Sequence, residues 1–134
     1  MQNPVQIDAL IARQAAARPG ATAIIDPNGA ISFAQFDAHI TAAADLLTGA
    51  GTQPGDRVLI VAENCLATAV FIFAASCAGA IAVPVNARMT APEIARVVDH
   101  AEPRVIVYTS DCSAEAAAHA GGASPHDIGF GPFH

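Results

Sequence analysis

Apolar and polar positions alternate along this chain with the periods of helices and strands. Apolar residues recur at helical spacing over residues 6–18, which predicts an amphipathic helix that ends at a Pro-Gly pair. Two apolar runs, 23–26 and 30–33, flank a Pro-Asn-Gly sequence. Because Asn-Gly between apolar runs is typical of a hairpin turn, the N-terminal part is expected to be a helix followed by a β-hairpin.

A second helix is indicated by its start, its apolar face and its end. Ser32 is followed three residues later by Gln35, which is the spacing of a capping box. Gly51 stands where the helix is expected to end. Between these points, one face of the helix carries the apolar residues Phe36, Ile40, Ala43, Leu46 and Leu47.

Beyond residue 56 the pattern alternates strands with helices. Residues 57–62 form a nearly continuous apolar run, which is typical of a strand buried on both faces of a parallel sheet. The elements expected after it are a helix over 65–78, a strand over 80–85, a helix from a Thr90–Glu93 capping box to about His100, and a strand over 104–108. We therefore predict an α/β fold, in which a parallel sheet with flanking helices follows an N-terminal β-hairpin.

The C-terminal end of the chain has a different pattern. Residues 114–120 are rich in alanine and predict one more short helix, whereas 121–134 show no clear periodicity and are expected to form a loop. We accordingly divide the chain into a domain over 1–110 and a short helix with an irregular tail over 111–134.

An uncharged stretch over 66–85 resembles a membrane span in length, since a spanning helix needs about 20 apolar residues. Gly79 and Pro84 interrupt the stretch, and no aromatic or basic anchors flank it. A buried helix followed by a buried strand fits better, so we expect no membrane span. The N-terminal residues also lack the pattern of a signal peptide.

Composition and charge narrow the functional classes. The 134 residues are 53% hydrophobic and 13% charged, against a usual charged share of about 25%. We therefore expect an oligomer partner or the rest of a larger protein to cover part of the surface. The net charge is −6, and the six basic residues are scattered arginines. Nucleic-acid binding is not expected without a basic patch, and no lysine is present for a P-loop or a Schiff base.

The cysteines and histidines favour neither a disulfide framework nor a metal site. Cys65, Cys77 and Cys112 form no Cys-x-x-Cys motif, which favours buried reduced thiols in a cytoplasmic protein. Cys112 comes nearest to a ligand cluster, with His119 and His126, but the expected loop gives no preorganised geometry. We therefore expect no metal site.

Five phrases of the sequence stand in a characteristic order: RPGATA at 18–23, ISFAQF at 31–36, QPGDRV at 53–58, AGAIAVPVN at 78–86 and TAPEI at 90–94. They resemble, in turn, the phrases RPDATA, LTYAEL, KPGDRV, AGAVAVPLN and TAEEL that open adenylate-forming enzymes of the acyl-CoA synthetase type. Each phrase alone is weakly specific, but the ordered set, over roughly residues 5–110, is a specific resemblance to this family. The ending Asn86-Ala87-Arg88 is more similar to acyl- or aryl-CoA ligases than to peptide-synthetase adenylation domains.

This resemblance implies a two-step reaction. A carboxylate attacks the α-phosphate of ATP in the presence of Mg²⁺, which gives an acyl-adenylate and pyrophosphate, and the thiol of coenzyme A (CoA) then takes the acyl group. The family's phosphate loop, nucleotide contacts, acyl pocket and catalytic lysine would lie beyond the matched residues. We therefore expect the chain alone to be inactive and to bind none of these cofactors tightly. It could be a truncated product, a remnant or a fragment, and its acyl substrate is left open.

The sequence Tyr108-Thr109-Ser110 resembles the start of the family's Tyr-Thr-Ser-Gly phosphate loop. Such a loop binds phosphate through glycine backbone N–H groups. Here Asp111 and Cys112 follow instead, and a carboxylate opposes a phosphate. We interpret this segment as the end of a strand.

Arg88 is the one residue to which the resemblance lends a role. It follows a predicted strand, at the end of the sheet where ligands of open α/β folds bind, and its planar fork of donors suits phosphate. In CoA ligases with a similar Pro-x-Asn-x-Arg ending, this arginine can contact the phosphates of CoA. The more common role is structural, in which Arg88 pairs with Glu93 or helps to cap the next helix.

The competing hypothesis is a small non-catalytic α/β scaffold or oligomerisation module. It predicts a well-folded, monodisperse chain. Part of a ligase domain predicts instead an uncovered sheet edge or apolar face, and hence poor solubility or self-association.

Overall fold

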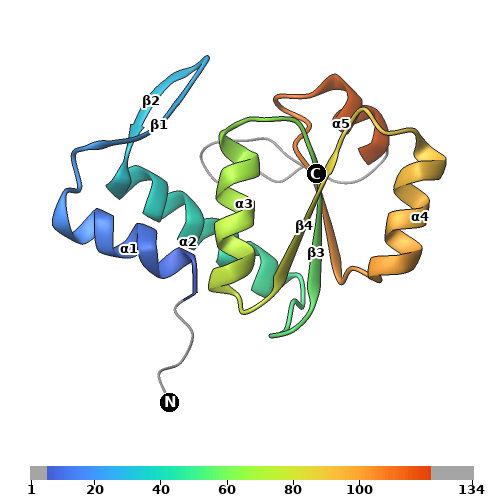
Figure 1. Ribbon diagram of the computed structural model, residues 1–134, viewed down its shortest axis with the longest axis horizontal. Coiled ribbons are helices and arrows are strands. Elements are labelled where there is room, and N and C mark those ends of the chain that lie inside the picture. Colours follow the sequence, from blue (N-terminus) through green and yellow to red (C-terminus); the bar gives the residue numbers. More distant parts are fainter. Residues whose placement is uncertain (1–5, 122–134) are drawn as a thin grey trace.

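The computed structural model describes residues 6–121 and contains two small sheets and a set of helices (Figure 1). The helices are α1 (Asp8–Ala17), α2 (Phe33–Gly49), α3 (Leu66–Cys77), α4 (Ala91–Ala101) and α5 (Ala114–Ala120). The strands are β1 (Thr22–Asp26), β2 (Gly29–Ser32), β3 (Arg57–Ala62), β4 (Ile81–Asn86) and β5 (Val105–Tyr108). Every element predicted from the sequence is present, with ends shifted by a residue or two. The expected loop after α5 lies largely outside the described residues.

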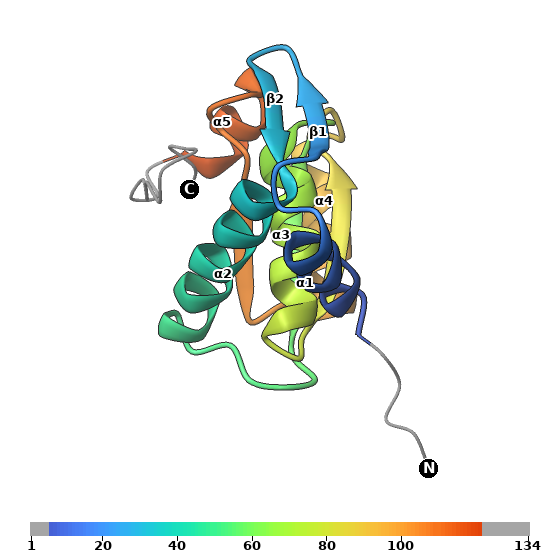
Figure 2. The same cartoon turned by 90° about the vertical axis from the view of Figure 1, so that its left-hand side faces the viewer.

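Three parallel strands form the main sheet, in the order β4-β3-β5. Leu59 at the centre of β3 lies opposite Val83 on one side and Ile106 on the other. Helices α2 and α3 pack on one face of this sheet and α4 and α5 on the other, while α1 packs against α2 and α3 (Figures 1 and 2). The predicted α/β class, with its parallel sheet and N-terminal hairpin, is confirmed.

The core divides between the two faces because successive side chains of a strand point in opposite directions. Val58 and Ile60 of β3 face α2 and α3, whereas Leu59 and Val61 face the side of α4 and α5. All four side chains are fully buried. The nearly continuous apolar run in the sequence therefore corresponds to a strand that is buried on both faces, as predicted, and the structure places it at the centre of the sheet.

Local hydrogen bonds explain where α2 and α4 begin. The Ser32 hydroxyl accepts a bond from the backbone N–H of Gln35 at 3.2 Å, and the Gln35 side chain accepts one from the N–H of Ser32 at 2.9 Å. At α4, Glu93 accepts a bond from the backbone N–H of Thr90 at 2.7 Å. Both predicted capping boxes are confirmed.

The strand β4 differs from its predicted buried state, because it lies at an edge of the sheet. The side chain of Ile81 is 54% exposed, and the other residues of β4 are half-buried or exposed. The backbone N–H of Ile81 donates to the carbonyl of Asp56, just before β3, and that of Ala87 donates to the carbonyl of Ala62 in β3. Every second backbone N–H between these two residues therefore points toward β3. Pro84 belongs to the outward-facing set, where its missing N–H removes no bond between strands.

The uncharged stretch over 66–85 forms α3 and β4 on either side of Gly79, in agreement with the prediction. Within residues 6–121, no helix combines the length and the apolar character that a membrane crossing requires.

Candidate functional site

The three parallel strands end at the same edge of the sheet, and their following loops meet there. The loop after β3 leads to α3, on one face of the sheet, whereas the loop after β5 leads to α5, on the opposite face. Neighbouring strands whose connections leave in opposite directions form a topological switch point, and open α/β sheets bind ligands in the crevice outside such a point. This edge of the sheet is therefore the candidate site.

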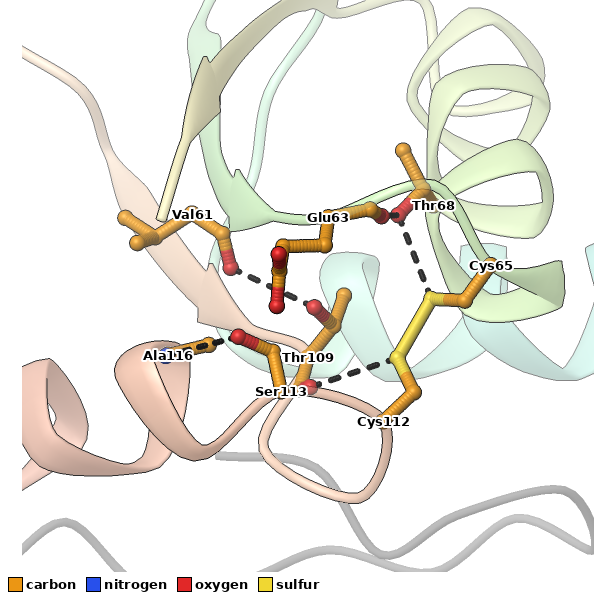
Figure 3. The surroundings of a disulfide bond; sticks show 8 residues. All are labelled: Val61, Glu63, Cys65, Thr68, Thr109, Cys112, Ser113 and Ala116. Carbon is orange, nitrogen blue, oxygen red and sulfur yellow. Dashed lines mark hydrogen bonds between the residues drawn. A yellow bond between two sulfur atoms is a disulfide. The ribbon is translucent and has the colours of Figure 1, made fainter. Parts of the chain in front are cut away.

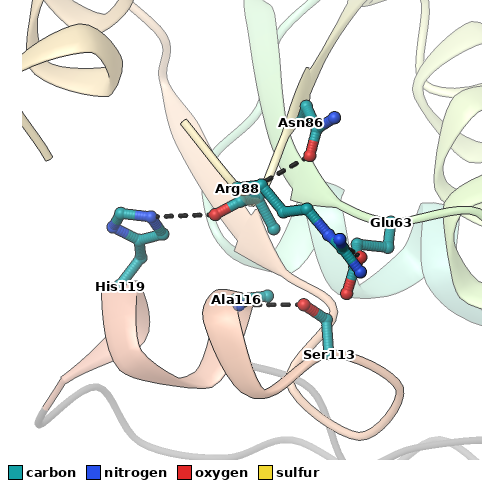
Figure 4. Close-up of polar contacts among 7 residues, drawn as sticks. Glu63, Asn86, Arg88, Ser113, Ala116 and His119 are labelled. Atoms are coloured by element: carbon teal, nitrogen blue, oxygen red, sulfur yellow. Dashed lines mark hydrogen bonds and ion pairs between the residues drawn. The ribbon is translucent and has the colours of Figure 1, made fainter. Parts of the chain in front are cut away.

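An ion pair joins the ends of β3 and β4 at this edge (Figure 4). The Nε–H of Arg88 donates to Oε1 of Glu63 at 2.7 Å. The backbone N–H of Arg88 also donates to Oδ1 of Asn86 at 2.9 Å, which fixes the turn after β4. The Arg88 side chain is 70% exposed and that of Glu63 25% exposed. The guanidinium therefore remains accessible to a ligand while it is paired.

Glu63 also connects to the start of α5. Hydrogen bonds from the Arg88 guanidinium, and next from Ser113, hold the pKa of the Glu63 carboxyl below its ordinary value. Ser113 is the N-cap of α5, and its hydroxyl oxygen accepts a bond from the backbone N–H of Ala116 at 3.0 Å (Figure 4). Glu63 is thus paired with Arg88 after β4 and lies beside the N-cap residue of α5.

In the structure Arg88 pairs with Glu63 and not with Glu93. Glu93, the expected partner, bonds instead to the backbone N–H and the hydroxyl of Thr90. Its carboxylate is engaged by the capping box, and Arg88 turns toward the end of β3. The sequence does place Glu63 just after β3 and Arg88 just after β4, two strands that lie side by side in the sheet. These positions predict the ion pair only when it is known that β3 and β4 are neighbours.

The expectation of buried reduced thiols is wrong. Cys65, before α3, and Cys112, in the loop after β5, are joined as a disulfide (Figure 3). Neither is buried, and Cys77 near the end of α3 is a free and exposed cysteine. The two paired cysteines are 47 positions apart. Spacing along the chain gave no indication of a pair that only the parallel arrangement of β3 and β5 brings together.

Two cavities open near the switch point. One, of about 200 Å³, lies between the turn of the β1–β2 hairpin, the first turn of α3 and the loop after β5, and both Cys65 and Cys112 line it. The other, of about 300 Å³, lies beside the ends of β3 and β4 and is lined by Glu63, Asn64 and Asn86, among others. The lining of the cavity beside the two cysteines is mainly apolar, whereas the lining of the cavity beside Glu63 is about equally polar and apolar.

The segment that resembles the start of a phosphate loop lies beside the first cavity. The strand β5 ends at Tyr108, as interpreted from the sequence. Thr109 is fully buried, and its backbone N–H donates to the carbonyl of Val61 at 3.1 Å. The next turn is closed by a bond from the N–H of Cys112 to the carbonyl of Thr109 at 3.2 Å.

His119 has a structural position in α5. Its Nε2 lies 3.0 Å from the carbonyl oxygens of both Ala87 and Met89, so this nitrogen carries the proton and donates to the turn after β4. Between residues 6 and 121, no three His, Cys, Asp or Glu side chains gather as a metal site. His126, the third member of the cluster considered from the sequence, lies outside the described residues.

Comparison with known proteins gives a consistent family. The sequence profile of the family described as AMP-binding enzyme matches residues 11–128. A long-chain-fatty-acid–CoA ligase of Mycobacterium tuberculosis is 30% identical over 101 residues, which cover 74% of this chain and 20% of that protein. A feruloyl-CoA synthase of an Amycolatopsis species is 33% identical over 110 residues, which cover 82% of this chain and 22% of that protein.

Solved structures agree with the sequence comparison. The inhibitor-bound N-terminal domain of FACL13 from Mycobacterium tuberculosis aligns with a TM-score of 0.77 at 27% identity, over 89% of this chain and 30% of that one. A fatty acyl CoA synthetase of the same organism aligns with a TM-score of 0.72 at 29% identity, over 75% of this chain and 20% of that one. The chain thus spans about a fifth of the length of the curated relatives described above.

Proposed function

The chain belongs to the AMP-binding enzyme family, and from this premise we propose that it is part of the N-terminal domain of a ligase that joins a carboxylate to CoA with ATP. The observation that carries the proposal is the family match over residues 11–128. The alignment of 89% of the chain with an N-terminal domain of the same kind supports it.

The proposed reaction has two steps. A carboxylate oxygen attacks the α-phosphorus of ATP and pyrophosphate leaves, which gives an acyl-adenylate. The CoA thiol then attacks the acyl carbon, AMP leaves and the thioester forms. A Mg²⁺ ion would neutralise phosphate charge, and we assign none of the described residues to it. Because ATP and CoA are available in the cytoplasm, we propose the enzyme as a cytoplasmic one.

We propose that this chain contributes the strands and loops that form the switch point at the edge of the sheet. The buried strand β3 and its neighbours hold three loops at one edge of the sheet, and the Glu63–Arg88 ion pair joins the loops after β3 and β4. The sequence has no lysine, and the loop 109–113 has no glycine to approach a phosphate with its backbone. We therefore propose that the chain by itself does not form the adenylate.

The test is the exchange of labelled pyrophosphate into ATP. The purified chain, supplied with ATP, Mg²⁺ and a panel of aliphatic and aromatic carboxylates, is expected to give no exchange above a control without protein. In a chimera, the part of a full-length family ligase that corresponds to residues 11–110 is replaced by residues 11–110 of this chain. This chimera is expected to show carboxylate-dependent exchange. Exchange by the chain alone would contradict the proposed inactivity, whereas failure of a well-folded chimera would contradict the proposed role as part of a ligase.

Arg88 is proposed as a contact for the phosphates of CoA. Its guanidinium is exposed at the switch point, and its ion pair with Glu63 uses only Nε in the described geometry. In the chimera, Arg88→Ala is expected to raise the KM for CoA severalfold while pyrophosphate exchange stays unchanged. Arg96→Ala, which removes an exposed arginine from α4, is the matched control. An unchanged KM for CoA would leave Arg88 with its structural role alone.

A further inference from the structure

The pair Cys65–Cys112 stands at the point where the chain diverges to the two faces of the sheet (Figure 3). We propose that these two cysteines form a reversible thiol–disulfide site whose reaction partner is a low-molecular-weight disulfide such as oxidised glutathione. This inference does not depend on the ligase reaction. It concerns a modification of the loops that frame the first cavity.

The positions of the two cysteines suit both formation and reduction of the bond. Their Cα atoms are 6.7 Å apart, within the range that a disulfide spans without movement of the backbone. Cys112 is exposed and Cys65 is half-buried, and both line the open cavity of about 200 Å³. A small disulfide or thiol can therefore approach the sulfur atoms from solvent.

The surroundings distinguish the two sulfur atoms. Cys65 is the N-cap residue of α3, a 12-residue helix whose N-cap side chain makes no capping bond. The partial positive charge at a helix N-terminus favours a thiolate there. The Cys112 sulfur instead lies 3.4 Å from the carbonyl oxygen of Thr109, whose partial negative charge opposes a thiolate. Cys65 is therefore the attacking thiolate and Cys112 the resolving thiol.

Cys77 provides a contrast within the same chain. Partial desolvation, and next the carboxylate of Asp8, raise the pKa of its thiol. No second cysteine of the described chain pairs with it. Cys77 is therefore a poor competitor for the same oxidant near neutral pH.

The chemistry balances in two exchange steps. The Cys65 thiolate attacks one sulfur of the external disulfide, a protein mixed disulfide forms, and one small thiolate leaves. Cys112, as its thiolate, then attacks the sulfur of Cys65 and expels the second small thiolate. The protein dithiol loses two protons and two electrons, and the external disulfide is reduced to two thiols after protonation. An excess of the small thiol reverses both steps.

The consequence is a covalent clamp across the candidate site. The bond joins the loop after β3 to the loop after β5, which otherwise leave the sheet toward opposite faces. Oxidation fixes the spacing of the two loops on one side of the cavity, and reduction releases the turn at 109–113. Disulfides in cytoplasmic proteins, when present, are usually transient and either catalytic or redox-sensing. A reversible site is consistent with the cytoplasmic location that we propose.

The test starts from the reduced and desalted chain. It is incubated with oxidised glutathione, free thiols are blocked with N-ethylmaleimide, and the digested peptides are identified by mass spectrometry. The expected product is the Cys65–Cys112 bridge, formed equally in Cys77→Ser and removed by excess reduced glutathione. A chain that retains free thiols at both positions, or crosslinks chiefly through Cys77, would overturn the proposal. So would a bridge that resists reduction in the folded chain.

Single variants test the order of the two steps. Cys112→Ser is expected to accumulate glutathione on Cys65 severalfold faster than Cys65→Ser accumulates it on Cys112. Equal rates, or the reverse order, would overturn the assignment of Cys65 as the attacking residue. Amide hydrogen exchange provides a structural readout, because reduction should speed exchange over 109–113 and leave the central strand β3 unchanged. Unchanged exchange in the loop would overturn the clamp, whatever the outcome for ligase activity.

Discussion

At the scale of single residues, Glu63 has more partners than its place after a strand suggests. It accepts a bond from Arg88, which follows β4, and lies beside Ser113, the N-cap residue of α5. An exposed ion pair by itself stabilises a protein little. The importance of Glu63 is geometric, since one carboxylate holds loops that are distant in the sequence. The charge state of this group therefore affects the candidate site as a whole.

The lowered pKa of Glu63 predicts how its contribution depends on pH. Because the folded state binds this proton less readily than the unfolded state, its contribution to stability is present above the unfolded value and is lost as pH falls through the folded one. Glu63→Gln should therefore lower the free energy of unfolding at neutral pH. The difference from the unaltered chain should shrink as pH falls below the ordinary glutamate pKa of about 4.3. Urea unfolding at a series of pH values measures it.

Glu102→Gln is the control for this series, because Glu102 is exposed at the end of α4. It should follow the pH profile of the unaltered chain closely. A Glu63→Gln profile that remains parallel to that of the unaltered chain through the acid range would contradict the role given to Glu63. High salt should reduce the effect, since the Arg88 side chain is largely exposed.

At the scale of elements, the connection between α3 and β4 depends on Gly79. Its φ of +72° is in the region that residues with a side chain rarely adopt, and a Cβ there would lie 3.2 Å from the Cβ of Pro54. Its carbonyl accepts a bond from the N–H of Gly55 at 2.9 Å. This contact joins the turn before β3 to the turn before β4. The two adjacent strands are thereby aligned where both begin.

Gly79→Ala is accordingly expected to lower the free energy of unfolding by about 1–3 kcal/mol, because strain in the backbone and the contact with Pro54 add. Gly49→Ala, at the end of α2, is the matched control. A Cβ there meets no atom within 4 Å, and its φ is not positive. It should leave stability unchanged or raise it by up to about 1 kcal/mol. Equal effects of the two variants in chemical unfolding would contradict this account.

At the scale of the whole molecule, an apolar face remains open beside the edge strand β4. Ile7 and Ile81 are 45% and 54% exposed, and with Ile72, Ala82 and Pro84 they line a shallow, mainly apolar depression. The outward position of Pro84 opposes continuous backbone pairing at this edge. Association through this face would therefore rest on side-chain contact. Such a face agrees with the expectation that something covers part of the surface.

We expect this face to mediate self-association of the isolated chain. Ile81→Arg should shift the distribution toward monomer, because a charge at the centre of an apolar contact opposes its burial. Ile25→Arg places the same charge on the hairpin, where Ile25 is 78% exposed, and should have little effect. Sedimentation velocity over a range of concentrations measures both. A monomer at every concentration for the unaltered chain would contradict the expectation and favour an independent small protein.

Local sequence determined the elements of this protein. The capping boxes at Ser32 and Thr90 depend on bonds between residues three positions apart, so their spacing alone predicts where α2 and α4 begin. The apolar run 57–62 likewise predicted a buried strand, because a strand covered on both faces carries little polar surface. The ordered phrases over residues 18–94 resembled those of a known family, and the family match over residues 11–128 agrees with this.

The tertiary structure determined which strands and which side chains lie next to one another. The order β4-β3-β5 leaves β4 at an edge, although its sequence is as apolar as that of a buried strand. It also brings together Glu63 with Arg88 and Cys65 with Cys112, pairs separated by 25 and 47 positions. Such pairs depend on which strands become neighbours and on which face each crossover takes. These choices result from the packing of the whole chain, and no local pattern records them.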